Sequence, residues 1–341
     1  MVKRGNLFFC VLLIRLFWGV FDCQAVELMD RPPSEKDEPT KVSFFIFVID
    51  IDDIDGAKQN FTANVGLRLQ WKDTRLAKDV KSIRMLPLNK VWSPRILLAN
   101  RQTLTRVSLP EVVEVTAEGV VNYRQRYVGP LSQPMSLSDF PFDEHKFTIQ
   151  FVALGFREQD LEFVPGKSKE YKIEGGEMAE KLSQPDWKIG KYSAQGRAYE
   201  PIKGFKYAAF DFEFTAKRHL LYYIWQVIVP LVFIVAMSWG AFWIDPEHAG
   251  AQIGVATSSM LTLIAYRFML GDLLPRLPYM TRMDYFTLAA TALVFLAFVE
   301  VVTTTILTYK KKGQIARKID IFARVVFPTV YITCSTWALF L

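Results

Sequence analysis

The chain has 341 residues, of which 51% are hydrophobic and 22% charged, and its formal net charge is +6. This composition is too apolar for an ordinary water-soluble enzyme and too charged for a protein that lies wholly in a membrane, so it predicts one domain of each kind. The sequence has no Ser-His-Asp grouping in a supporting motif, no phosphate-binding glycine loop and no His or Cys cluster. These absences argue against an enzyme, and we expect no cofactor and no metal.

Residues 1–25 are predicted to be a signal peptide. Lys3 and Arg4 precede an apolar run from Leu7 to Val20, and the small residue Ala25 follows at the expected cleavage site. The run is shorter than a membrane span and carries Arg15, so we interpret it as an export signal and not as an additional span. Export would place residues 26–217 outside the cytoplasm.

Residues 26–217 are predicted to form an all-β extracellular domain, an immunoglobulin-like sandwich. Short alternating or apolar runs recur there, and no segment has the pattern of a long amphipathic helix. The runs are Val42 to Val48, Phe61 to Trp71, Val112 to Val115, Val120 to Tyr127, Phe147 to Val152 and Tyr207 to Thr215. Many strands at this spacing favour a β-sandwich. The polar stretch from Gly166 to Ser183 is interpreted as a long loop near a site or interface.

Residues 218–341 are predicted to be an all-α domain of four transmembrane helices, at about 220–243, 250–272, 284–308 and 319–341. Glu300 interrupts the third span and Arg324 lies in the fourth. The connection of about ten residues between these two spans carries five basic residues and no acidic one, as expected of a cytoplasmic loop. We therefore expect a multi-pass protein of the plasma membrane, surrounded by lipid. The basic cluster abuts helices, so nucleic acid is not an expected partner.

The second span carries a distinctive stripe. Steps of three and four residues place one set of side chains on one helix face: Gly254, Ser258, Leu261, Ala265, Phe268 and Asp272. The stripe begins small and hydroxylated, becomes bulky and apolar, and ends in a carboxylate, whereas the rest of the helix is apolar. This pattern predicts the wall of a pore. Considered alone, it also fits a transmembrane helix whose Ser and Thr residues bond to their own turn.

Several motifs together resemble the pentameric ligand-gated ion channels, the Cys-loop receptors. They occur in that family's order over roughly residues 40 to 341: Trp71 with Asp73, Val91-Trp92-Ser93-Pro94, Phe140-Pro141-Phe142-Asp143, Arg218 before the first span, Pro230 within it, and Leu274-Pro275-Arg276-Leu277-Pro278-Tyr279 after the pore helix. Other residues, including Phe147, replace the family's signature cysteines. The chain therefore resembles the bacterial branch, which implies a homopentamer in a bacterial inner membrane.

The resemblance implies that five second spans surround a pathway for inorganic ions. Leu261 and Phe268 would then form apolar rings that close it by dewetting. Asp245 and Glu247 precede this span and Asp272 ends it, so carboxylate rings at both mouths would concentrate cations. The intervening Gly250-Ala251-Gln252 matches neither the cation-conducting nor the anion-conducting pattern. Cation selectivity is our prediction, and an anion-selective channel is the alternative.

The resemblance also places an agonist site between subunits. The positions that match its aromatic box are Phe156, Tyr199, Phe205 and Tyr207. On the complementary face, Arg68 resembles the arginine that binds the ligand carboxylate in glycine and GABA receptors, and Arg124 lies on a second such strand. A guanidinium binds a carboxylate through a bidentate pair, so a small carboxylate or amine is the expected agonist. The arginines are alternatively solvated strand residues or partners in interface salt bridges.

Coupling between the two domains is expected at an ion pair of Asp143 with Arg218, at Phe142 and at the linker from Pro275 to Pro278. The acidic run ending at Asp55 is expected to pair with Arg218, Lys217 or Arg276, with calcium binding as an alternative. Histidines 145, 219 and 248 suggest proton sensing, but none falls on the pore stripe, and for His219 ordinary placement at the membrane entry is the favoured interpretation. A membrane-anchored ligand-binding protein with a non-conducting helical bundle is the competing class of function.

Overall fold

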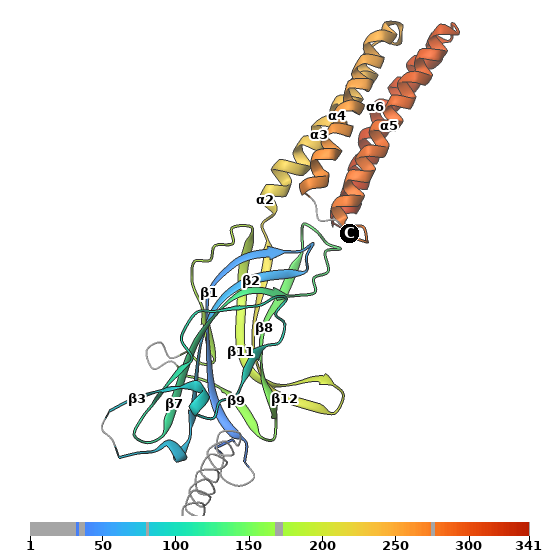
Figure 1. Ribbon diagram of the computed structural model, residues 1–341. Helices are drawn as coiled ribbons and strands as arrows, with labels where there is room; N and C mark the ends of the chain where they lie inside the picture. The colour runs from blue at the N-terminus through green and yellow to red at the C-terminus, as the bar shows by residue number, and fades with distance from the viewer. Residues whose placement is uncertain (1–31, 34–37, 80–81, 168–172, 274–276, 341) are drawn as a thin grey trace, which may run out of the picture.

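The computed structural model describes residues 32–33, 38–79, 82–167, 173–273 and 277–340, with the side chain of Asp272 outside the description. The predicted signal peptide and Pro275 also lie outside the described residues. The chain forms an elongated molecule in which a β-sandwich and a bundle of long helices are joined end to end (Figure 1). Both predicted parts of the fold are therefore present.

The sandwich consists of an eight-stranded and a four-stranded sheet. The larger has the order β10-β1-β2-β7-β6-β3, with β9 pairing with β1 and β5 with β7, and the smaller has the order β11-β12-β8-β4. The strands are β1 (Thr40–Asp55), β2 (Asn60–Lys72), β3 (Arg84–Pro87), β4 (Ile96–Leu98), β5 (Arg106–Val107), β6 (Val112–Val115), β7 (Val120–Ser132), β8 (Glu144–Arg157), β9 (Leu161–Pro165), β10 (Gly176–Met178), β11 (Trp187–Ile202) and β12 (Phe205–Arg218). Short 3-10 turns, η1 (Thr74–Leu76) and η2 (Leu88–Lys90), lie between strands.

Stacked aromatic rings fill the space between the two sheets. Alternate residues of β2 are buried, as a strand with one face on a core requires. Phe44 of β1 stacks on Phe210 of β12 with ring centroids 4.4 Å apart. Phe147 of β8 is fully buried and packs edge-on against Phe61 of β2, in the other sheet, with ring centroids 5.2 Å apart. Buried apolar aromatic surface thus joins the two sheets.

Strand β11 has no counterpart among the predicted strands. Most of its residues are exposed, so it lacks the regular burial that makes a strand recognisable in sequence. It is specified instead by its antiparallel pairing with β12, from Trp187 opposite Arg218 to Ile202 opposite Phe205. The stretch from Gly166 to Ser183, predicted to be a loop, contains the short strand β10, which runs parallel to β1.

Four helical spans follow, each long and apolar enough to cross a membrane. The first combines α2 (Leu220–Tyr223), the π-helical turn η3 (Ile224–Ile228), α3 (Val229–Gly240) and the 3-10 turn η4 (Ala241–Trp243). After η5 (Pro246–His248) come α4 (Ala249–Leu273), α5 (Arg282–Tyr309) and α6 (Gly313–Phe340). The fourth span begins six residues before the predicted position, so only Lys310–Lys312 separate it from α5.

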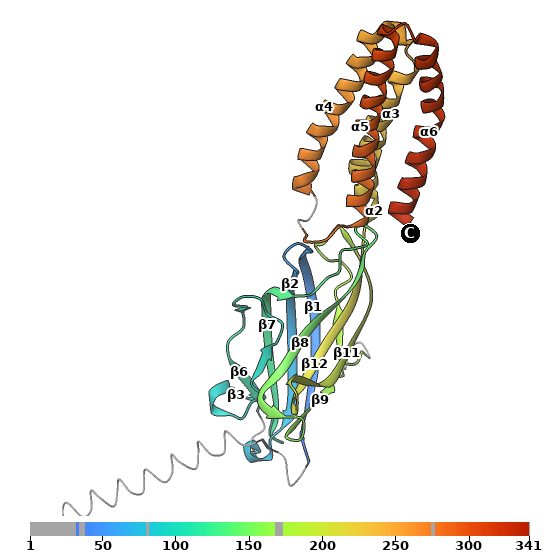
Figure 2. The same ribbon diagram turned by 90° about the vertical axis from the view of Figure 1, so that its right-hand side faces the viewer.

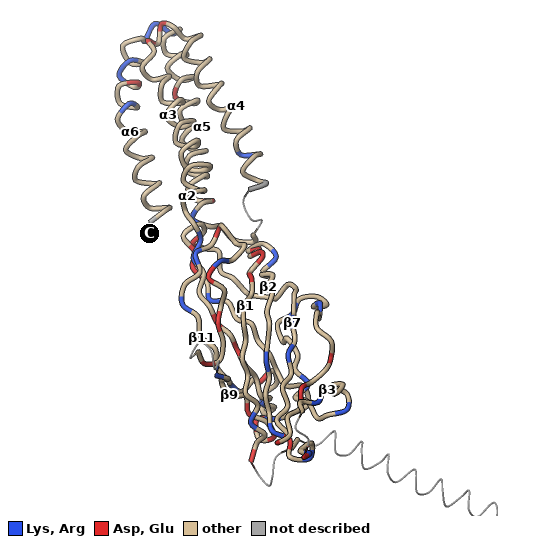
Figure 3. The backbone as a smooth tube through the Cα atoms, turned by 90° about the vertical axis from the view of Figure 1, so that its left-hand side faces the viewer, with Lys and Arg blue, Asp and Glu red and all other residues tan. Residues whose placement is uncertain are grey.

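The helices occupy different places in the bundle, and charged residues are few along them. Figure 2 shows α4 at one side of the bundle and α6 at the other, with α3 and α5 between them. Charged residues are frequent over the sandwich and sparse along the helices, where they lie mainly near the end farthest from the sandwich (Figure 3). An uncharged stretch of this length is what a bilayer core requires.

Tyr266 of α4 ties the first span to the second. Pro230 has no N–H, so the Gln226 carbonyl four residues earlier loses its normal helical donor. The Tyr266 hydroxyl replaces that donor, with oxygen distances of 3.0 Å to the Gln226 carbonyl and 2.9 Å to the Val227 carbonyl. The π-helical turn at Pro230 is thereby satisfied by a side chain of the neighbouring helix.

Candidate functional site

The predicted pore stripe lies on the free face of α4. Its described members, Gly254, Ser258, Leu261, Ala265 and Phe268, are all exposed, with Leu261 at 62% and Phe268 at 78% of their full surface. The opposite face packs against the neighbouring helices through buried residues, among them Gln252, Ala256, Ser259 and Leu263. Helix α4 thus has a packed side and an unpartnered side, and the stripe occupies the latter.

The hydroxyl groups of α4 differ in whether they bond to their own helix. Ser259 donates to the Val255 carbonyl and Thr262 to the Ser258 carbonyl, at 2.9 and 2.8 Å, so these two bond to their own turn. The Ser258 hydroxyl is on the exposed face and makes no hydrogen bond within the described part of the chain. Self-bonding therefore explains Ser259 and Thr262 and leaves Ser258 available to water or an ion.

Two carboxylates lie at the end of α4 farthest from the sandwich. Asp245 precedes η5 and accepts a hydrogen bond from the Glu247 N–H at 3.0 Å, while the Glu247 side chain remains exposed. The nearby Gly250 has no atom within 4 Å of an added Cβ, so the chain is unconfined there. These predicted mouth residues are close together in the chain and in the structure.

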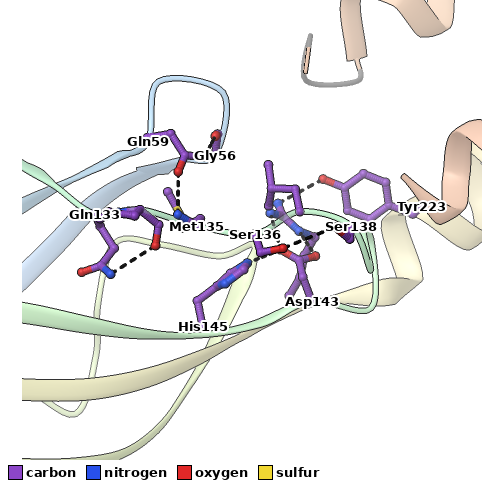
Figure 4. A network of polar contacts seen from close by, with 12 residues as sticks. Gly56, Gln59, Gln133, Met135, Ser136, Ser138, Asp143, His145 and Tyr223 are labelled. Atoms are coloured by element: carbon purple, nitrogen blue, oxygen red, sulfur yellow. Dashed lines mark hydrogen bonds and ion pairs between the residues drawn. The ribbon is translucent and has the colours of Figure 1, made fainter. Parts of the chain in front are cut away.

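Asp143 and Arg218 form the ion pair predicted for the junction of the two domains. Arg218 Nε lies 2.9 Å from Asp143 Oδ1, and its Nη2 lies 3.0 Å from Oδ2, which is a bidentate pair. His145 Nε2 lies 2.9 Å from the same Oδ2. The guanidinium is 4.1 Å from the centre of the Trp187 ring. Figure 4 shows Asp143 bonded to His145, with Tyr223 pointing in from the first span.

The environment of this pair fixes its charge. Asp143 is 3% exposed, and burial alone would raise its pKa. The hydrogen bonds from His145 and Arg218, together with the positive charge of Arg218, outweigh burial and lower the pKa of Asp143 to about 2. Burial also acts to lower the pKa of Arg218, but its hydrogen bond to Asp143 raises it. Both groups therefore stay ionised at neutral pH.

The linker before α5 docks on the loop that contains Asp143. The Leu137 N–H donates to the Tyr279 hydroxyl at 3.0 Å, and the Arg282 N–H donates to the Ser138 carbonyl at 3.0 Å. The Arg282 side chain also bonds Asp139 at 2.8 Å. Of the predicted coupling residues, Phe142 lies half-buried in this loop, and Pro278 lies exposed in the linker beside Tyr279.

Asp55 does not pair with Arg218 or Lys217 among the described residues. Asp55 pairs with Lys58 of the same turn at 2.8 Å, and its carboxylate also accepts the Lys58 N–H. Asp50, in the same acidic run, accepts hydrogen bonds from Ser183. Neither carboxylate reaches Arg218 among the described contacts, and Arg276 lies outside the described residues. The turn thus satisfies Asp55 locally, whereas Asp50 is held by a residue far along the chain.

The predicted aromatic residues of the agonist site are not all accessible. Phe156 is 7% exposed and packs edge-on against Trp92 at 5.5 Å, so it belongs to the core of the single chain. Tyr199 and Tyr207 face each other across β11 and β12, and Arg157 lies over the Phe205 ring at 5.8 Å. The tip of this hairpin projects away from the sandwich (Figure 1).

The two predicted arginines have different partners. Arg68 and Arg124 are opposite each other on β2 and β7. Arg124 faces Glu114 at 3.2 Å, so its charge is already compensated. Arg68 has no carboxylate partner within the described residues; it lies over the Phe45 ring at 5.6 Å and donates to the Lys167 carbonyl at 3.0 Å. Arg68 thus keeps donors for another anion, since a guanidinium has five.

The sequence alone did not indicate a coupling role for Asp139, Trp187, Tyr279 or Arg282. Tyr279 ends a family motif, but nothing in a single sequence relates its hydroxyl to the Leu137 N–H. Trp187 lies in the unrecognised strand β11, where an isolated large aromatic residue among polar neighbours was the available signal.

Two family models match the chain. The model of the neurotransmitter-gated ion-channel ligand binding domain matches residues 27–220, and that of the neurotransmitter-gated ion-channel transmembrane region matches residues 227–316. The chain is 26% identical to a proton-gated ion channel of Gloeobacter violaceus, over 97% of this chain and 91% of that channel. It is 24% identical to the gamma-aminobutyric acid receptor subunit alpha-2 of Bos taurus, over 82% of this chain and 63% of that subunit.

Proposed function

The chain belongs to the family of neurotransmitter-gated, pentameric ligand-gated ion channels, and from this premise we propose that five copies surround a cation-selective pore opened by a small ligand or by protons. The observation that carries the proposal is the unpartnered face of α4. A single copy of this face encloses nothing, whereas five copies around an axis place the Ser258 hydroxyls toward a common water-filled pathway.

The proposed gate is the apolar part of the stripe. Leu261 and Phe268 project from the free face of α4 and, in a ring of five, form two successive apolar constrictions. Water leaves a narrow apolar constriction more readily than a polar one, so the pore closes without a physical plug. The smaller Ala265 leaves a wider segment between these constrictions, and Gly254 leaves another before the first of them.

Cation selectivity is proposed from the carboxylates at the pore mouths. Asp245 and the exposed Glu247 form the ring at one end, and Asp272 forms the ring at the other. Fixed negative charge at a mouth raises the local concentration of cations. The test is the reversal potential of purified protein in a bilayer with unequal NaCl on the two sides. A potential that follows sodium supports the proposal, and one that follows chloride establishes the anion-selective alternative.

The agonist site is proposed between the β11–β12 hairpin of one subunit and Arg68 of the next. Tyr199, Phe205 and Tyr207 supply aromatic surface, and Arg68 supplies donors for a carboxylate. The relatives are named for two stimuli, protons and gamma-aminobutyric acid, and the latter carries both a carboxylate and an amine. Phe156 and Arg124 have weaker support, because one is buried and the other is paired with Glu114.

A recording experiment separates the two kinds of stimulus. Currents are measured while the outer solution is stepped through pH without ligand, and then at neutral pH with small carboxylates and amines. If a carboxylate opens the pore, Arg68→Ala should abolish that response, whereas Arg126→Ala, which removes an exposed arginine bonded to Asn64, serves as the control. An unchanged response in Arg68→Ala removes this residue from the site. Absence of current under all conditions favours the non-conducting, membrane-anchored alternative.

A further inference from the structure

Three polar side chains meet inside the helical bundle, near the end farthest from the sandwich. They are Gln252 of α4, Glu300 of α5 and Asp320 of α6. Gln252 and Asp320 are 0% exposed, and both carboxyl oxygens of Glu300 are buried. An apolar cluster surrounds them, made of Ala241, Phe242, Ala256, Ala297, Val301 and Ala323. We call the three residues the inner carboxyl site.

Gln252 supplies few hydrogen bonds to this site. Its Nε2 donates to the Ile244 carbonyl at 2.8 Å and to the Ala241 carbonyl at 3.3 Å. Both N–H groups of this amide therefore already have acceptors. The contact of the same nitrogen with Asp320 Oδ2 is longer, at 3.5 Å. Gln252 therefore links the pore helix to the site but does not neutralise it.

The two carboxyl groups face each other without a neutralising cation. Glu300 and Asp320 lie within hydrogen-bonding reach of one another. In the described part of the chain, no N–H or O–H group donates to either oxygen of Glu300, and Asp320 Oδ1 also lacks a donor. A hydrogen bond between two carboxyl groups needs a proton on one of them, because ionised carboxylates only accept.

The nearest charges do not change this conclusion. Arg324 is one turn from Asp320, but its Nε donates to the Phe242 carbonyl at 2.9 Å and its guanidinium lies over the Trp243 ring at 5.4 Å. It forms no ion pair with Asp320 among the described residues, although its positive charge acts on that carboxyl group from a distance. Asp245, on the connection before α4, adds a further negative charge near Asp320. Arg324 is thus held by other groups and does not pair with Asp320, and Asp245 adds a second negative charge beside it.

We propose that Glu300 and Asp320 share one proton and form a proton-binding site that joins α5 to α6 and, through Gln252, to the pore helix. Two adjacent buried carboxylates cannot both be ionised at low cost, since each raises the energy of the other and neither is hydrated. A shared proton removes one charge and creates the missing donor. Its loss would leave two facing carboxylates that push α5 and α6 apart. This inference is independent of the proposed agonist and ion selectivity.

The direct test is infrared difference spectroscopy of the purified wild-type protein. A protonated carboxyl group has a carbonyl stretching band that an ionised carboxylate lacks. We expect this band at neutral pH in the wild type, and its loss in Glu300→Gln and in Asp320→Asn. Its absence from the wild-type spectrum overturns the proposal without requiring any variant to fold.

Thermal unfolding of the detergent-solubilised assembly gives a second readout. The folded protein retains a proton that exposed carboxyl groups of the unfolded chain have already lost above about pH 4.3, so the wild-type midpoint should fall as the pH rises from about 5 through neutrality. In Glu300→Gln the amide donates permanently, and this part of the pH dependence should disappear. Glu162→Gln, which makes the same change at an exposed strand position, should follow the wild type.

The double variant distinguishes a shared proton from two independent ones. If one proton serves both groups, either single substitution removes the pH-dependent shift, and Glu300→Gln with Asp320→Asn together remove no more. If the two single variants each remove part of the shift and their effects add, the carboxyl groups titrate separately and the proposal is wrong.

Discussion

Arg218 holds Asp143 through two parallel hydrogen bonds, of 2.9 and 3.0 Å, at the point where the sandwich meets the helices. The Arg218 side chain lies between the rings of Trp187 and Phe140, at 4.1 and 4.9 Å from their centres. A planar, stacked and bidentate contact of this kind specifies arginine and not merely a positive charge.

Substitution of either member of this pair should be severe. Asp143→Asn leaves a buried guanidinium without its counter-ion, at a cost of about 3 to 5 kcal/mol per subunit. Arg218→Lys keeps the charge but loses the bidentate bond and the stacking, so it should not restore function. The measurements are assembly by size-exclusion chromatography and current per surface-expressed channel. Asp139→Asn, in the same loop but exposed, should have a much smaller effect. Wild-type currents in Arg218→Lys would show that only charge matters.

Acid should weaken the outer domain through the same carboxylate. The pKa of Asp143 is lowered to about 2 in the folded protein, against about 3.9 for an exposed aspartate. Its contribution to stability is therefore complete above pH 3.9 and is lost as the pH falls toward 2. The difference corresponds to about 3 kcal/mol per subunit. Acid unfolding followed by tryptophan fluorescence should show this loss in the wild type, and Asp143→Asn should be less stable at neutral pH but less sensitive to acid in this range. A parallel acid dependence in the two proteins would contradict the assignment.

Replacing Leu261 by Ser should ease opening of the pore. A ring of five hydroxyls hydrates the proposed constriction and so removes part of the advantage of the closed state. A change of about 1.4 kcal/mol in the gating equilibrium would lower the stimulus for half-maximal current roughly tenfold. Leu288→Ser makes the same change at an exposed position of α5 and should leave the stimulus unchanged. Equal curves for Leu261→Ser and the wild type would exclude Leu261 as the gate.

Removing the Tyr266 hydroxyl should weaken the contact between the first two spans. Tyr266→Phe leaves the Gln226 and Val227 carbonyls without their donor, which costs about 1 to 3 kcal/mol. We expect a lower thermal midpoint and an altered stimulus for half-maximal current. Tyr285→Phe is the matched control, because its hydroxyl has no hydrogen bond in the described structure. If both variants behave alike, the π-helical turn does not depend on this hydroxyl.

The sequence predicted those parts of the fold that repeat a simple pattern. Strand β2 buries alternate residues, and the four spans are continuous apolar segments, so both were recognisable. Strand β11 is mostly exposed and gains its structure from β12, which a local pattern does not contain. The fourth span begins earlier than predicted because charged residues such as Arg317 remain helical beyond the apolar core.

The same distinction explains the candidate sites. The free face of α4 follows from helical spacing alone, and the Asp143 to Arg218 pair followed from a family motif. The pairing of Asp55 with Lys58 was not predicted, although Lys58 lies in the same turn and competes with Arg218 and Lys217 for this carboxylate. The docking of Tyr279 on the Leu137 N–H depends on where two loops meet, and a single sequence does not contain that position.

The packing of Phe147 against Phe61 of the opposite sheet has a practical consequence. Because aromatic packing holds the sheets together, reducing agents have no covalent link to cleave between residues 26 and 333, where the sequence has no cysteine. A thiol introduced anywhere in that stretch would be its sole site for a fluorophore or spin label, with Cys334 in the last span as the one native thiol of residues 26–341. Movement of the β11–β12 tip relative to the helices is thus open to distance measurements in an otherwise unaltered outer domain.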